Sequence, residues 1–289
     1  MPGLFDTINI NGLKLKNRLV MPPMATKMAT EEGEVTEKHI KHYTARARGG
    51  VGLIIIEHTY VSKDGQMSPG QMGLYDDKLI HGCEQLVKAI HREGAKVAIQ
   101  LTHAGAKASR EITGKQPFGP SDIMPPKGSE APRPLTVPEM NAIIKSFGEA
   151  TRRALDAGFD SVEIHGAHGF LLCQFLSPYT NKRKDEYGGD MIKRLLFPLE
   201  VIKEVKSKLG RNTPLFYRYP GDDMVEGGLT LNDAKLAAPH VEKAGVDVFD
   251  VSAGLSGSGH ERFTQQGYFV PLAEGIKQVM KVPVIGVGN

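Results

Sequence analysis

The sequence predicts an α/β fold, a (β/α)8 barrel of which this chain carries seven strands. Short continuous apolar runs alternate with helical stretches, and continuous runs are typical of strands buried on both faces of a parallel sheet. No Gly-rich phosphate turn follows the first strand, although an open nucleotide-binding sheet usually has one. Polar residues stand where the strands end, which is where a barrel gathers its active site. These observations favour the barrel over the open sheet.

The predicted strands are runs rich in Val, Ile, Leu and Phe. In chain order they cover residues 18–24, 52–57, 96–101, 161–165, 214–219, 248–252 and 283–287. Amphipathic helices are predicted over residues 77–93, 136–157, 191–209 and 230–244, each followed by glycine, which readily adopts the left-handed conformation that ends a helix. Thr136 three residues before Glu139 predicts a capping box. The long connection from residue 102 to 136 contains several prolines and is expected to be an irregular loop over the barrel mouth.

Seven strands are one fewer than this type of barrel needs. The missing βα unit predicts an open edge on each side of the sheet and an unfilled interior layer. We therefore expect one domain over residues 1–289 that is incomplete at its C-terminus, as in a truncated form of a longer protein.

Composition excludes several classes of protein. The chain is 40% hydrophobic and 24% charged, with a net charge of +3 and basic residues interspersed with acidic ones, which argues against a nucleic-acid surface. Cys83 and Cys173 lie in different segments and form no metal-binding pattern, so a structural zinc or iron–sulfur site within this chain is not expected. No signal peptide and no long apolar run is present, so we expect a cytoplasmic enzyme without a membrane partner.

The segment HGAHGF places two histidines at the end of a predicted strand. His165 and His168 are separated by small residues that keep the turn open, and paired imidazoles at such a place indicate hydrogen-bond donors in a site. A different hypothesis makes them metal ligands together with Glu163 and either Asp250 or Asp222, as in a metal-dependent barrel hydrolase or lyase. The residues alone leave both hypotheses open.

Seven stretches spread over almost the whole chain carry a specific resemblance. They are LKNRLVMPPMAT, GGVGLIIIE, AIQLTHAG, FGPSDI, PRPLT, HGAHGFLLCQFLSPYTNKRKDEYGG and RYPGDD. In this order they resemble the Old Yellow Enzyme family, in its FMN-dependent NADH:flavin oxidoreductase and enoate reductase branch. The resemblance implies a TIM barrel, FMN as cofactor, and NADH or NADPH as hydride donor.

The resemblance also implies roles for individual residues. The resemblance places the loop of Pro22, Pro23, Met24 and Ala25 beside the flavin and His58 at the flavin edge. It places Gln100 and Arg218 at the pyrimidine half of the ring. Arg218 would stabilise the negative charge that develops on reduction. His165 and His168 would donate to the carbonyl oxygen of an α,β-unsaturated substrate. Hydride would pass from NAD(P)H to flavin N5 and then to the β-carbon, while a proton reaches the α-carbon. A homo-oligomer is compatible with this expectation.

Three departures from the family pattern affect the expected activity. Phe170 occupies the usual position of a tyrosine that donates the proton, and a positioned general acid typically contributes about 10²–10⁴-fold. Solvent, Tyr60 or Tyr179 would have to replace it. Ala25 stands where many members have Cys or Thr, so the contact that tunes the flavin potential is absent or moved to Thr26. In barrels of this type, the loops after strands seven and eight bind the FMN phosphate, and this segment is not present in the 289 residues. A catalytically silent truncated flavin barrel is therefore a further alternative.

Overall fold

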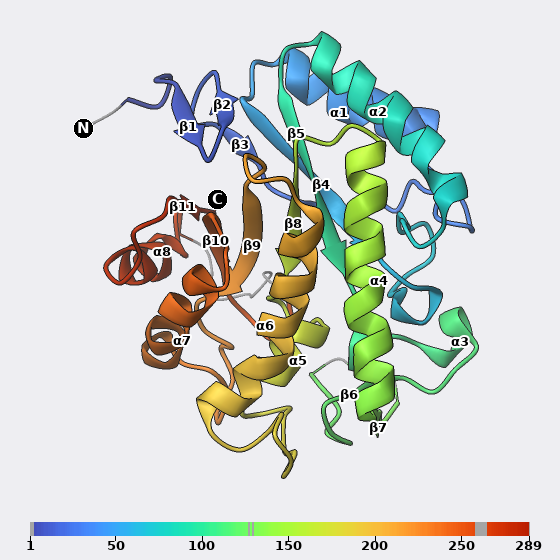
Figure 1. Ribbon diagram of the computed structural model, residues 1–289, viewed down its shortest axis with the longest axis vertical. Coiled ribbons are helices and arrows are strands. Elements are labelled where there is room, and N and C mark those ends of the chain that lie inside the picture. The colour runs from blue at the N-terminus through green and yellow to red at the C-terminus, as the bar shows by residue number, and fades with distance from the viewer. Residues whose placement is uncertain (1–2, 127, 129, 258–264, 289) are drawn as a thin grey trace.

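A curved parallel sheet forms the centre of the molecule. The computed structural model describes residues 3–126, 128, 130–257 and 265–288. Seven strands, all paired in parallel, follow the order β3-β4-β5-β8-β9-β10-β11 and curl into an incomplete barrel (Figure 1). They are β3 (Val20–Met21), β4 (Leu53–Tyr60), β5 (Lys96–Thr102), β8 (Ser161–His165), β9 (Leu215–Pro220), β10 (Val248–Ser252) and β11 (Val284–Gly286). All seven predicted strands are confirmed.

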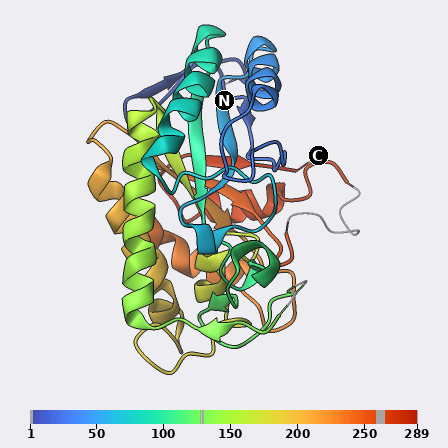
Figure 2. The ribbon, with the colours of Figure 1, turned by 90° about the vertical axis from the view of Figure 1, so that its right-hand side faces the viewer.

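Helices cover the outside of the sheet (Figures 1 and 2). The longer ones are α1 (Glu37–Arg48), α2 (Ile80–Arg92), α4 (Val137–Asp156), α6 (Met191–Lys208), α7 (Leu231–Lys243) and α8 (Val270–Lys277). The four predicted helices correspond to α2, α4, α6 and α7, and the capping box of α4 is confirmed by the bond from the Thr136 N–H to Glu139 Oε2 at 2.9 Å. Helix α1 was not predicted because its buried face contains His39 and Tyr43 rather than an aliphatic stripe.

A hairpin that was not predicted closes the end of the barrel where the strands begin. Strands β1 (Ile8–Ile10) and β2 (Leu13–Leu15) pair in antiparallel orientation. Their buried side chains pack with Leu53, Phe216 and Val248, which come from the first residues of β4, β9 and β10. The hairpin therefore caps the barrel at the end opposite to the carboxyl ends of the strands.

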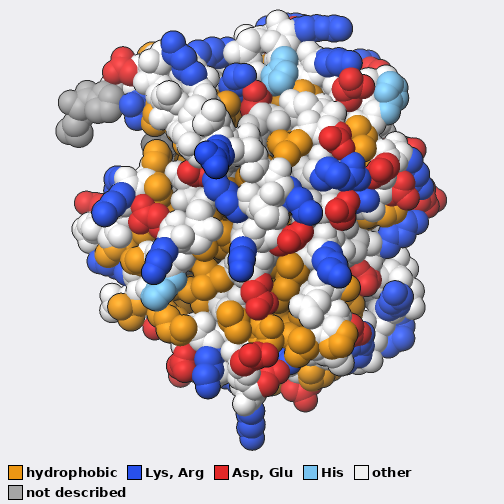
Figure 3. Space-filling model, viewed as in Figure 1, with side chains coloured by type: hydrophobic (Ala, Val, Ile, Leu, Met, Phe, Trp, Pro, Cys, Tyr) orange, Lys and Arg blue, Asp and Glu red, His pale blue; other side chains and the backbone are white. Residues whose placement is uncertain are grey.

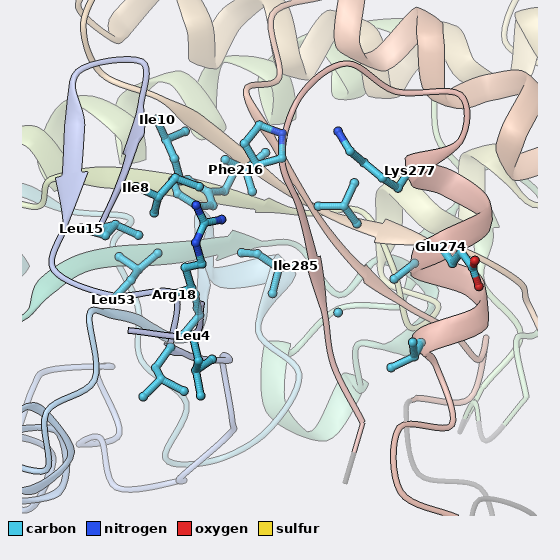
Figure 4. A pocket seen from close by; sticks show the side chains of 18 of the residues that line it. Leu4, Ile8, Ile10, Leu15, Arg18, Leu53, Phe216, Glu274, Lys277 and Ile285 are labelled. Carbon is cyan, nitrogen blue, oxygen red and sulfur yellow. The ribbon is translucent and has the colours of Figure 1, made fainter. Parts of the chain in front are cut away.

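An apolar groove separates the two edge strands. Strands β3 and β11 each have one neighbour in the sheet, which confirms the expected open edges. The groove has a volume of about 800 Å³, and Figure 4 shows the side chain of Arg18 surrounded there by apolar residues. It is lined by residues of the hairpin and of the barrel strands, among them Ile8, Leu53, Phe216 and Ile285. The groove belongs to the capped end of the barrel.

Short helices and strands lie in the loops at the other end of the barrel, where the barrel strands end. The connection expected to be irregular contains a 3-10 turn at Gly105–Lys107, helix α3 (Arg110–Thr113) and a small parallel pair, β6 (Phe118–Gly119) with β7 (Arg133–Pro134). Helix α5 (Leu171–Leu176), entirely buried, follows the histidine segment. Gln174 on α5 links the two regions, because its amide donates to the Ala104 carbonyl at 2.9 Å and accepts from the Ala106 N–H at 3.0 Å.

The surface carries charges of both signs. On the face seen in Figure 3, Lys and Arg side chains are interspersed with Asp and Glu, and hydrophobic side chains gather in the lower part of the view. Among the described residues, no helix combines the length and apolar character needed to cross a bilayer.

Candidate functional site

Polar side chains from four neighbouring strands meet at the carboxyl ends of the barrel strands. The strand register places His165 opposite Arg218, and Arg218 opposite Asp250. Gln100 lies opposite Glu163 in the same way. Since the strands are parallel, their carboxyl ends share one edge of the sheet, and residues far apart in the sequence come together there. The prediction that strand-end residues such as Gln100, His165 and Arg218 gather at one face is confirmed by this arrangement.

The turn after β8 is shaped by two glycines that have no room for a side chain. A Cβ on Gly166 would lie 2.2 Å from the ring of Tyr217, and one on Gly169 would lie 2.1 Å from the carbonyl oxygen of Leu255. His168 between them has φ of 56°, a left-handed conformation that costs a non-glycine residue energy. Tight packing therefore holds the backbone in the conformation that presents both imidazoles to the mouth of the barrel.

The two imidazoles stand perpendicular to each other, with ring centroids 5.1 Å apart. His165 is buried, and its Nδ1 accepts a hydrogen bond from the Ala167 N–H at 3.3 Å, so the ring carries its proton on Nε2. His168 is half-buried, and its Nε2 lies 2.7 Å from the Ser252 hydroxyl. Burial lowers the pKa of both imidazoles well below the usual value, which makes them neutral at pH 7.

An aromatic ring lies where the family pattern has a phenol. Phe170 packs 4.3 Å from the ring of His165 and 5.3 Å from the ring of His58, measured between centroids. The Lys107 ammonium lies 5.2 Å from the centroid of Phe170 and donates to the His168 carbonyl at 2.8 Å. Tyr60, considered as a substitute for the missing tyrosine, instead stacks on Tyr75 at 5.4 Å. The mouth of the barrel thus combines three imidazoles, a benzyl ring and a cation.

His58 is held by a glutamine that sequence reasoning did not identify. Gln71 accepts from the Met67 N–H at 2.8 Å, which fixes its amide orientation, and then donates to His58 Nδ1 at 2.9 Å and to the His58 carbonyl at 3.1 Å. Burial lowers the pKa of His58 to about 4, and the nearby Lys107 cation acts in the same direction. His58 is therefore a neutral imidazole whose proton is on Nε2.

The loop after β3 is anchored at its far end by a buried carboxylate. In this loop Pro22 and Pro23 are half-buried, whereas Met24 and Ala25 are exposed. Glu57 accepts hydrogen bonds from the Thr26 N–H and, at 3.0 Å, from the Thr26 hydroxyl. His39 on α1 approaches the same carboxylate through Nε2 at 3.2 Å. The Thr26 hydroxyl, considered above as a replacement for the missing tuning contact, is thus bonded to Glu57.

A network of four buried polar side chains lies just inside the mouth. Gln100 Nε2 donates to Glu163 Oε1 at 2.8 Å, and an Arg218 terminal nitrogen donates to Asp250 Oδ2 at 2.5 Å. The partner of Arg218 is therefore Asp250, across the sheet, rather than Asp222 or Asp223, which are near it in sequence. The Nε–H of Arg218 is buried and has no acceptor within the part of the chain that the structure describes. Leaving such a donor unpaired costs about 1–3 kcal/mol, so this nitrogen calls for an acceptor from a ligand.

The unpaired Arg218 nitrogen is the observation that tests whether a flavin suits the site. The pyrimidine edge of a flavin offers carbonyl oxygens and a ring nitrogen as acceptors, to which an arginine Nε–H can donate, and one ring N–H as a donor, from which a glutamine carbonyl oxygen can accept. Gln100 gives its Nε2 to Glu163, which leaves its carbonyl oxygen as an acceptor. The residues present therefore fit the chemistry of this group.

The alternative metal site lacks an assembled set of ligands. Within residues 3–126, 128, 130–257 and 265–288, no three His, Cys, Asp or Glu side chains are grouped to hold a metal ion. Glu163 and Asp250 take part in the network with Gln100 and Arg218, and Asp222 accepts the Met224 N–H at 2.7 Å.

Comparison with known proteins identifies relatives along the whole chain. The model of the NADH:flavin oxidoreductase / NADH oxidase family matches residues 3–289. An NADH oxidase of Thermoanaerobacter brockii is 46% identical, over 99% of this chain and 45% of the relative. An NADPH dehydrogenase of Clostridium acetobutylicum is 40% identical, over 99% of this chain and 83% of the relative. The chain thus spans about half the length of the first of these relatives.

Solved structures with the same fold agree with this result. A 2-naphthoyl-CoA reductase bound to 2-naphthoyl-CoA is 28% identical, with a TM-score of 0.92 over 97% of this chain and 46% of that one. An old yellow enzyme homologue from Zymomonas mobilis is 27% identical, with a TM-score of 0.87 over the whole of this chain and 82% of that one.

Proposed function

Because the chain belongs to the NADH:flavin oxidoreductase / NADH oxidase family, we propose that it is an FMN-dependent NAD(P)H oxidoreductase that reduces the C=C bond of α,β-unsaturated carbonyl compounds. One observation carries the proposal. The neutral donor His165 and the unpaired Nε–H of the buried Arg218 come from neighbouring strands and occupy opposite positions in the register. We take residues 1–289 as one FMN-binding barrel domain.

Arg218 and Gln100 are the side chains proposed to hold the pyrimidine half of FMN. The loop Pro22–Ala25 would run beside the ring, and His58 would line its edge. When bound, FMN supplies a centre that accepts a hydride from NAD(P)H and donates it to a second substrate. A fixed cation at Arg218 stabilises negative charge without reorganisation, because the guanidinium is already held by Asp250.

His165 is proposed to bind the carbonyl oxygen of the substrate through its Nε2–H. A neutral imidazole donor polarises the conjugated alkene and stabilises charge that develops on the oxygen in the transition state. His168 supplies a second donor when its Nε2 turns from Ser252, 2.7 Å away, to the substrate. Loss of one such donor typically lowers the rate by about 10²–10³-fold.

Phe170 limits how the α-carbon obtains its proton. Its ring packs against that of His165 but has no proton to donate. Reduction of the flavin by NAD(P)H needs no general acid, whereas protonation of the α-carbon benefits from one. We therefore expect the first half-reaction to be efficient and the second to be slow in this chain.

A visible absorption spectrum of the purified full chain, recorded under nitrogen, tests the proposal. We expect a flavin spectrum, bleaching on addition of NADPH or NADH, and return of the oxidised spectrum when 2-cyclohexen-1-one is added. A saturated ketone, cyclohexanone, is the matched control and should leave the reduced spectrum unchanged. A colourless protein whose thermal stability does not change with added FMN would overturn the proposal.

A further inference from the structure

Two carboxyl groups in the barrel interior lie in one network with a single cation. Glu163 on β8 and Asp250 on β10 are both fully buried. Each accepts a hydrogen bond through one oxygen, Glu163 from the Gln100 amide and Asp250 from the Arg218 guanidinium. The second oxygen of each, Glu163 Oε2 and Asp250 Oδ1, is also buried, and while both groups are ionised it has no donor among the described residues.

A single proton can satisfy both of these oxygens. Two buried carboxylates beside one guanidinium would leave an uncompensated negative charge and two unsatisfied oxygens in a medium of low polarity, which is costly. If Glu163 carries a proton and donates it to Asp250, both oxygens are satisfied and the network becomes neutral. The electrostatics agree, because burial and the Asp250 charge raise the pKa of Glu163 well above its usual value, although Arg218 lowers it in part.

An ion pair that served only the fold would not need Glu163. Arg218 and Asp250 already neutralise each other at 2.5 Å. Glu163 adds a second buried acid on the neighbouring strand, next to the amide of Gln100 on β5. The charged groups that act on Glu163 are Asp250 and Arg218, and those that act on Asp250 are Arg218 and Glu163. Arg218 and Gln100 therefore link the pair to a cofactor bound at the barrel mouth.

We propose that Glu163 and Asp250 share one proton and take up a second when the cofactor bound at Arg218 is reduced. The inference rests on the proposed function. Two electrons come from NAD(P)H, and negative charge then develops beside Arg218. This charge competes with Asp250 for the guanidinium, so that Asp250 becomes easier to protonate. Only an O–H bond forms in the protein, and its proton comes from solvent. Glu163 and Asp250 are positioning residues, since they act through Arg218 and Gln100.

The substitution Glu163→Gln separates the shared proton from the geometry. The glutamine amide can donate to Asp250 through Nε2 and still accept from Gln100 through Oε1, so both hydrogen bonds are kept while the titratable group is lost. Glu200→Gln is the matched control. Glu200 is a half-buried carboxyl on α6, outside the barrel, and burial raises its pKa as well.

The first experiment needs no cofactor. Infrared spectra of the full chain at neutral pH, prepared without FMN, should contain the C=O stretch of a protonated carboxylic acid that shifts in D₂O. We expect Glu163→Gln to lose this band and Glu200→Gln to keep it. A band that persists in Glu163→Gln would overturn the shared proton, independently of whether the protein binds a flavin.

The second experiment measures coupling to the cofactor. The FMN-loaded protein is photoreduced, and proton uptake per two electrons is followed with a pH indicator near neutral pH. We expect the unsubstituted protein and Glu200→Gln to take up one proton more than the double variant Glu163→Gln/Asp250→Asn, in which neither carboxyl group of the pair remains. Equal uptake in all three proteins, each with flavin bound, would overturn the coupling while leaving the proposed function intact. Failure of the full chain to bind FMN would refute the coupling together with the proposed function.

Discussion

The side-chain amide of Gln71 holds the imidazole of His58 in a single tautomer. Gln71 Nε2 donates to His58 Nδ1 at 2.9 Å, and its orientation is fixed by the Met67 N–H, which donates to Gln71 Oε1 at 2.8 Å. Neutral His58 must then carry its proton on Nε2. Its ring lies 5.3 Å from that of Phe170, so this Nε2–H donor stands at the mouth of the barrel.

Acid should destabilise the fold partly through His58. The pKa of His58 is about 4 in the folded chain and about 6.5 in an unfolded one, so below pH 6.5 the unfolded chain binds a proton that the folded chain does not. Stability is therefore lost as pH falls from about 6.5 to about 4. We expect the free energy of unfolding, measured with urea, to fall less between pH 6.5 and pH 4 in His58→Gln than in the unsubstituted protein. His81→Gln, at an exposed histidine on α2, is the control. An NMR titration that placed the pKa of His58 near 6.5 would contradict this.

A phenol at residue 170 should accelerate one half-reaction. In Phe170→Tyr the hydroxyl would be added to a ring 4.3 Å from His165 and beside the Lys107 ammonium, which favours its ionisable proton as a donor to substrate. We expect reoxidation of the reduced enzyme by 2-cyclohexen-1-one to rise by up to about 10²-fold, within the usual range for a general acid, with little change in reduction by NADPH. Stopped-flow measurement of each half-reaction provides the check.

Phe170→Leu is the control for this substitution, because it removes the ring without adding a proton. An equal increase in Phe170→Leu and Phe170→Tyr would show that the size of the side chain, and not a proton, limits the reaction. No change in Phe170→Tyr would mean that the α-carbon receives its proton without help from this position.

The sequence predicted the strands and their common edge because both depend on local patterns. A continuous apolar run such as the one in β4 can be recognised as a strand without knowing which strands lie beside it. Parallel strands bring their carboxyl ends to the same end of the sheet whatever their order. His165, Gln100 and Arg218 were located in this way. Their proposed contacts with a flavin came from the resemblance and stay predictions.

The partners of these residues could not be predicted, because they are set by register and by loop packing. Asp222 and Asp223 are nearer to Arg218 along the chain, but the register of β9 with β10 places Asp250 opposite it, and Asp250 is its partner. Gln71 reaches His58 from a loop with no periodic pattern. His39 lies on α1, whose apolar stripe is too weak to predict a helix from the sequence, and its contact with Glu57 could not be predicted either.

The two donor arrangements at His165 and His168 predict unequal effects of substitution. His165 has its Nε2–H ready, whereas His168 Nε2 is engaged with Ser252 at 2.7 Å. We expect His165→Ala to lower the rate of enone reduction by about 10²–10³-fold and His168→Ala to lower it less. His165→Asn, which keeps an N–H donor, should recover part of the loss. Single-turnover rates provide the measurement, and equal losses in both alanine variants would contradict the difference between the two donors.

Glu57 should control the loop proposed to run beside the flavin through hydrogen bonds rather than through substrate contact. Its buried carboxylate accepts from the Thr26 N–H and hydroxyl and lies 3.2 Å from His39 Nε2. In Glu57→Gln one oxygen becomes an amide N–H₂ that faces these donors, and a buried donor left unpaired costs about 1–3 kcal/mol. We expect the free energy of unfolding to fall by this amount, measured by urea denaturation, and FMN affinity to fall with it.

Thr26→Val is the matched control for Glu57→Gln. It removes the hydroxyl that bonds Glu57 at 3.0 Å but keeps the side-chain shape and the backbone N–H, so it should weaken FMN binding less. The order of the two effects is decisive, because the backbone bond is the one that fixes the path of the loop from β3. If Thr26→Val weakened FMN binding as much as Glu57→Gln, the loop would be held by the hydroxyl, and the carboxylate would matter only as its acceptor.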